Sequence, residues 1–190
     1  MSKDVFKVRG NALEEEYFRR IDEKLALELR EKWQHERDIE ALKKESRIDD
    51  TAVIEEMLHV GIHPGMIQAL TLVPALHVAW ANGYVEKQER EAVLKAAESV
   101  GIATDSTTGQ LLMSWLTQKP SSELFQAWED YIEALHAVLD PLSFRLLHNS
   151  AVETARQVAE AAGGFLGVYS VSVAEERAIQ QIDAAFPKAG

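Results

Sequence analysis

Apolar residues recur at helical spacing along almost the whole sequence. They return every three or four positions, which is the period that places side chains on one face of an α-helix. No stretch shows the sustained alternation of β-branched and aromatic residues that a strand needs. We therefore predict an all-α protein of about eight helices. A chain of 190 residues can form one domain with a buried core, with room for a helical extension.

Capping residues, glycines and prolines set the expected helix limits. We expect helices near 12–47, 51–60, 66–81, 86–100, 106–119, 122–139, 141–162 and 173–186. The expected N-terminal caps are Asp49 or Asp50, Asp105 with Ser106, Ser121 or Ser122, Asp140, and Ser172. The segment 66–81 is apolar nearly all round, which predicts the most buried helix. Pro74 should bend it, because proline lacks the N–H that an α-helix interior uses.

The first 48 residues differ in pattern from the rest. Their first apolar residues repeat every four positions, at Leu13, Tyr17, Ile21, Leu25 and Leu29. Beyond Trp33 the stripe thins to Ile39 and Leu42 among dense charges. We therefore assign 1–48 to an N-terminal helical extension and 49–190 to a helical domain. The charged part is either a solvated helix face or a helix that binds a protein partner, a second copy of the chain included, through Trp33, Ile39 and Leu42.

Composition excludes several functions. The chain carries a net charge of −11, and a surface that acidic repels phosphate backbones, so we expect no nucleic-acid partner. It has no cysteine, which excludes disulfides, thiolate metal sites and a cysteine nucleophile. The longest apolar stretch, 66–81, is interrupted and short, so we expect no membrane span. These features favour a cytoplasmic protein.

Two segments far apart in the sequence are similar. Val85, Glu89, Ala92 and Val93 match Val171, Glu175, Ala178 and Ile179, which stand eighty-six residues later. Each segment follows an alanine-rich apolar helix and a glycine. This repetition predicts a duplicated helix-turn-helix whose two halves pack about a pseudo-twofold axis.

The two glutamates of this repeat have two interpretations. Ser172 and Glu175 form the pattern of a capping box, in which each side chain binds the other residue's backbone amide. Glu86 and Glu89 are a weaker version of it, because glutamate is a poor cap. In the functional interpretation, the two turns aim Asn82, Glu89 and Glu175 at one cation. Such oxygen ligands suit calcium or magnesium rather than zinc.

The segment Ala81-Asn82-Gly83-Tyr84-Val85-Glu86-Lys87-Gln88-Glu89 resembles the Ala-Asp-Gly-x-hydrophobic-x-x-x-Glu signature of TerB-like proteins, the tellurite-resistance TerB family. With the repeat at 171–175, the resemblance covers roughly residues 65–186. It implies an all-helical fold of two related halves, no catalysis, an association with stress or tellurite resistance, and an acidic site proposed to bind metal. The family's turn aspartate is Asn82 here, which brings no charge and should weaken divalent-ion binding.

A second hypothesis makes the chain an enzyme. Glu56 with His59, and Glu133 with His136, both have Glu-x-x-His spacing on expected helices. Carboxylate-bridged di-iron bundles use this spacing, although a chain with so many glutamates produces it by chance. The alternative to a non-enzymatic TerB-like module is therefore a metal-dependent enzyme. His77, within the apolar segment 66–81, is expected to be a hydrogen-bonded core histidine.

Overall fold

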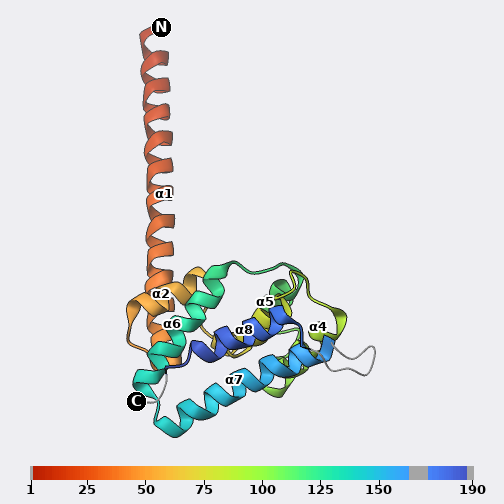
Figure 1. The fold of residues 1–190 in the computed structure, drawn as a ribbon. Helices are drawn as coiled ribbons and strands as arrows, with labels where there is room; N and C mark the ends of the chain where they lie inside the picture. Colours follow the sequence, from red (N-terminus) through yellow and green to blue (C-terminus); the bar gives the residue numbers. More distant parts are fainter. Residues whose placement is uncertain (1, 163–170, 188–190) are drawn as a thin grey trace. The chain divides into compact units, whose positions relative to one another are not determined.

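The computed structural model describes the backbone of residues 2–162 and 171–187, and the side chains of residues 20, 23–161 and 171–187. All the regular secondary structure in these ranges is helical. The elements are α1 (Ser2–Ser46), α2 (Thr51–His59), the 3-10 helix η1 (Ile67–Leu72), α3 (Val73–Ala79), α4 (Lys87–Ser99), α5 (Thr107–Thr117), α6 (Ser122–Val138), α7 (Pro141–Ala162) and α8 (Val173–Ala184) (Figure 1). The prediction of an all-α fold with eight α-helices is confirmed. None of the helices in these ranges is long and apolar enough to cross a lipid bilayer.

Contacts divide the chain into two units, Met1–Glu40 and Ala41–Gly190. In the first unit, Leu25, Leu29 and Trp33 are exposed on α1. The other expected members of this stripe, Leu13, Tyr17 and Ile21, lie outside the described side chains.

The last turns of α1 belong to the second unit. Leu42 is fully buried there, and Ser46 and Ile48 are buried nearby. The expectation that Leu42 is a free contact for a partner was therefore wrong, because its side chain is part of the core. The carboxylate of Glu45 accepts a hydrogen bond from the backbone N–H of Gly65 at 2.9 Å, which ties the end of α1 to the start of η1.

The second unit is built around α3. Every residue of this helix except His77 is buried, and α3 packs against α6, α7, α8 and η1. The expectation of one long α-helix bent at Pro74 was wrong, because a 3-10 helix and a separate α-helix occupy this segment. The chain changes from 3-10 to α geometry at this point, and Pro74 lies in the first turn of α3, where no intrahelical bond uses its missing N–H.

Caps that the sequence predicts precede α2, α5, α6, α7 and α8, whereas α1 begins at Ser2 and not near residue 12 as expected. Side-chain oxygens accept hydrogen bonds from first-turn backbone N–H groups at Asp50, Ser106, Asp140 and Ser172. The start of α6 is different. Ser121 occupies the cap position, but its side chain makes no cap hydrogen bond and its hydroxyl donates instead to Glu123 at 3.3 Å.

One glycine is required by close packing, and we predict a large effect of replacing it. A Cβ at Gly109 in α5 would lie 2.2 Å from the carbonyl oxygen of Ala103 and 2.8 Å from backbone atoms of Thr104. These are backbone atoms, which cannot move aside as the end of a flexible side chain can, so a Cβ would clash. We expect Gly109→Ala to lower the free energy of unfolding by about 2–4 kcal/mol in denaturant titrations.

The control is Gly101→Ala. Gly101 has a φ of +82° and no atom within 4 Å of a built Cβ, so only the left-handed backbone opposes the substitution. A loss of about 1–2 kcal/mol is expected there. Equal losses for the two variants would contradict the packing argument at Gly109.

Candidate functional site

The two look-alike turns start α4 and α8 with nearly the same backbone geometry. Glu86, which precedes α4, has φ −72° and ψ 161°, and Ser172, which precedes α8, has φ −68° and ψ 161°. Both residues are extended, as the N-cap position of a helix requires. Ser106 before α5 and Ser121 before α6 have the same geometry, with ψ of 162° and 159°, so the match follows from the N-cap position and does not test the repeat.

Each turn is closed by its glutamate. A carboxylate oxygen of Glu89 accepts the backbone N–H of Glu86 at 2.6 Å, and one of Glu175 accepts the N–H of Ser172 at 2.6 Å. The hydroxyl of Ser172 in turn accepts the N–H of Glu175 at 3.2 Å. Both short carboxylate bonds are charge-assisted when the glutamate is ionised. The capping interpretation is confirmed at both helix starts.

The two turns also meet in space. The amide Nδ2 of Asn82 donates to Oε1 of Glu175 at 3.1 Å, although the residues are ninety-three positions apart. The hydroxyl of Ser172 donates to the amide oxygen of Asn82 at 3.3 Å. Asn82 thus ties the turn before α4 to the first turn of α8. The three residues predicted as cation ligands, Asn82, Glu89 and Glu175, lie in one neighbourhood.

Glu89 and Glu175 are the only buried carboxylates among the described side chains, at 1% and 2% exposure. The pKa of Glu89 is raised to about 7. Burial is the largest cause, the hydrogen bond from the Glu86 backbone opposes it, and the charges of Glu175 and Glu86 add to it. Glu89 is therefore expected to gain or lose its proton near neutral pH.

The oxygens of this pair suit a hard cation. One oxygen of Glu89 accepts no hydrogen bond within the described residues, and Oε1 of Glu175 accepts only from Asn82. Carboxylate and amide oxygens are ligands of calcium and magnesium. No group of three or more His, Cys, Asp or Glu in the described part of the chain is arranged to hold a metal. A cation here would need the Asn82 oxygen and backbone or water oxygens to complete its shell, so metal binding stays a prediction.

Comparison of the chain with protein-family models, with curated proteins and with solved structures finds no match. The resemblance to TerB-like proteins therefore stays a prediction that depends on the turn residues themselves. The duplication stays a prediction as well, because other helix starts share the N-cap geometry of the two turns.

The Glu-x-x-His pairs are placed on exposed helix surfaces. Glu56 and His59 are exposed on α2, and Glu133 and His136 are exposed on α6. A hydrogen bond with Asp130 is the largest cause of a raised pKa at Glu56. The ring of His136 packs on Phe144 with ring centroids 4.7 Å apart. Glu56, His59 and His136 thus contact other neighbours, and none of the four side chains belongs to a metal-ligand cluster in the described residues.

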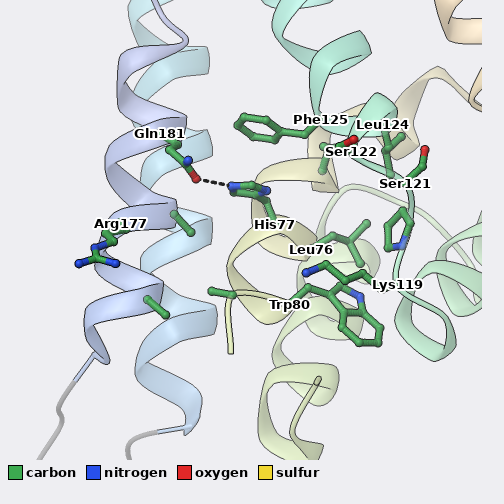
Figure 2. Close-up of a pocket in the computed structure, with 15 residues that line it drawn as sticks. Leu76, His77, Trp80, Lys119, Ser121, Ser122, Leu124, Phe125, Arg177 and Gln181 are labelled. Carbon is green, nitrogen blue, oxygen red and sulfur yellow. Dashed lines mark hydrogen bonds between the residues drawn. The ribbon is translucent and has the colours of Figure 1, made fainter. Parts of the chain in front are cut away.

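Sequence reasoning missed a cavity of about 410 Å³ between α3, α8 and the start of α6 (Figure 2). His77 lines it, and its Nε2 is 2.8 Å from the amide oxygen of Gln181. This is the hydrogen-bonded histidine that the sequence predicts, but it faces the cavity. Lys119 and Arg177 also line the cavity. No sequence signal could reveal them, because they come from a connection and a helix that only folding brings together.

The raised pKa of Glu89 predicts a pH dependence of stability. Its folded-state pKa of about 7 exceeds its ordinary value of 4.5, so the stability linked to its protonated form is full below pH 4.5 and is lost as the pH rises through 7. Against Glu89→Gln, which keeps an acceptor oxygen, the parent protein should lose roughly 1–3 kcal/mol of unfolding free energy between pH 5 and 8.

Denaturant titrations at several pH values measure this difference. The matched control is Glu98→Gln, at an exposed position of the same helix. Its curve should run parallel to that of the parent, because the side chain of Glu98 is exposed and makes no contact with the buried pair. If the Glu89→Gln curve is also parallel to the parent, Glu89 does not titrate near neutrality.

Proposed function

We propose that the chain is a non-enzymatic, cytoplasmic, TerB-like helical module that takes up one divalent cation, calcium or magnesium, between its two look-alike turns. In this proposal Asn82, Glu89 and Glu175 hold the cation. The resemblance to TerB-like proteins adds a role as an interaction module associated with stress or tellurite resistance. The supporting observation is the burial of two carboxylates from distant segments in one neighbourhood.

The negative charge of this buried pair favours a bound cation. Two ionised carboxylates removed from water repel each other and lose hydration, and this is why the pKa of Glu89 rises. A proton on Glu89 neutralises only that carboxylate. A divalent cation neutralises both carboxylates together and replaces the water that burial removed. Above pH 7, where the proton leaves, the pair is therefore a favourable place for a small hard cation.

The expected affinity is low. Calcium takes six to eight oxygens, and affinity falls as charged ligands are lost from a site. Asn82 contributes no charge, and its amide group is already hydrogen-bonded on both sides. We expect a dissociation constant on the order of 10⁻⁴ to 10⁻³ M.

We also propose that the chain binds a protein partner. Residues 51–190 hold 17 Asp and Glu against 8 Lys and Arg, so a basic surface is the complementary partner. On α1, exposed Leu25, Leu29 and Trp33 supply apolar contacts in the first unit. A second copy of the chain is the alternative occupant of these contacts.

Calcium titration by isothermal calorimetry at pH 8, where Glu89 is ionised, tests the cation site. The parent protein should bind one equivalent, and Glu89→Gln and Glu175→Gln should each weaken binding by about tenfold or more, because each removes a charged ligand. Glu98→Gln should bind like the parent. No heat in the parent, or unchanged heat in both ligand variants, would remove the cation from the proposal.

Asn82→Asp separates a ligand role from a purely structural one. The substitution restores a carboxylate at the family's position but removes the N–H donor to Glu175. Without cation, unfolding free energy should fall by roughly 1–3 kcal/mol, since a third carboxylate then faces the pair. With calcium, affinity should rise about tenfold and restore the loss. Loss of stability with no gain in affinity would mean that Asn82 serves only to join the turns.

A further inference from the structure

The cavity between α3, α8 and the start of α6 lies wholly within the second unit of the chain. Its volume of about 410 Å³ falls in the range of protein pockets that hold small molecules. Figure 2 shows His77 at its centre, with Gln181 on α8 at one wall and Phe125 and Ser122 of α6 at another.

Three flat rings, those of His77, Trp80 and Phe125, belong to the lining, and contacts hold them in place. The ring of His77 stacks on Phe125, with ring centroids 3.9 Å apart and planes 16° from parallel. The indole Nε1 of Trp80 donates to the carbonyl of Trp115 at 2.8 Å. Burial lowers the pKa of His77, the hydrogen bond to the amide oxygen of Gln181 opposes this, and the charge of Lys119 lowers the pKa further. His77 therefore supplies a flat uncharged surface.

The charge of the lining is opposite to that of the protein. The chain has 31 Asp and Glu against 20 Lys and Arg, yet no carboxylate lines the cavity and two cations do. Neither Lys119 nor Arg177 forms an ion pair with the described residues. In Figure 2 Lys119 extends across the cavity toward Leu76 and Trp80, whereas the guanidinium of Arg177 is directed away from His77. Lys119 is thus the cation placed to meet a ligand, and Arg177 can act only at the rim.

The beginning of α6 borders the cavity, and Glu123 in its first turn accepts a hydrogen bond from the hydroxyl of Ser121 and opposes the positive end of the helix dipole. Ser121 and Ser122 line the cavity, and no side chain caps the helix there. The uncapped first-turn N–H groups carry partial positive charge. Glu123, the acidic residue of this turn, does not line the cavity and lies 3.4 Å from Nε2 of His59.

We propose that this cavity binds a small organic carboxylate with a flat apolar body, whose carboxylate pairs with Lys119 and whose body lies against Trp80, His77 and Phe125. A single lysine suits a singly charged group as a point charge. The rings and Leu76 exclude water from the apolar part of the ligand. The inference does not depend on the proposed cation, which would lie at the turns before α4 and α8.

The probe is 2-naphthoate, and its uncharged counterpart is 2-naphthamide. Binding is followed in EDTA-containing buffer by the indole N–H signal of Trp80 in ¹H–¹⁵N NMR spectra, assigned with Trp80→Phe. Trp33, on the exposed part of α1, supplies the reference signal. We expect saturable shifts of the Trp80 signal with 2-naphthoate, no shift of the Trp33 signal, and at least fivefold weaker binding of the amide.

Lys119→Gln should weaken binding of 2-naphthoate five- to tenfold and remove its advantage over the amide. Lys119 is exposed on a connection, so the variant should keep its fold. Lys95→Gln, at an exposed position of α4 that does not line the cavity, should bind like the parent. Absence of saturable Trp80 shifts up to millimolar probe, or equal affinity in Lys119→Gln and the parent, would overturn the proposal.

Discussion

Burial of α3 is the constraint on which the second unit depends. This short helix is enclosed by α6, α7, α8 and η1, and all of its side chains but one are removed from water. Its only partly exposed residue, His77, lines the cavity, and the turn that follows it carries Asn82. The burial of α3 thus positions both the cavity at His77 and the turn that carries Asn82.

Local signals in the sequence were enough to predict the starts of α2, α5, α7 and α8, but not those of α1 and α3. A capping hydroxyl or carboxylate acts on N–H groups two or three residues away, so Asp50, Asp140 and Ser172 could be recognised without knowing the fold. The meeting of Asn82 with Glu175 was predicted from the repeat, because related segments tend to pack symmetrically.

Other features depend on contacts between distant segments. The change from 3-10 to α geometry before Pro74 and the burial of Leu42 follow from packing in the second unit. The cavity requires Lys119 from the α5–α6 connection together with Gln181 of α8. These residues stand far apart and have no common spacing. The sequence therefore could not indicate that a cationic, ring-lined cavity forms inside an acidic protein.

The hydrogen bond between Asn82 and Glu175 makes the beginnings of α4 and α8 one mechanical unit. If the first turn of α8 opens transiently, Glu175 moves away, and water reaches Glu89 as well. Hydrated Glu89 then ionises more readily, so alkaline solution favours the opened form. Amide protons at the two helix starts should consequently exchange with solvent in concert, although ninety-three positions of chain separate the linked residues. A single acid–base equilibrium would in this way govern the local motions of two distant segments.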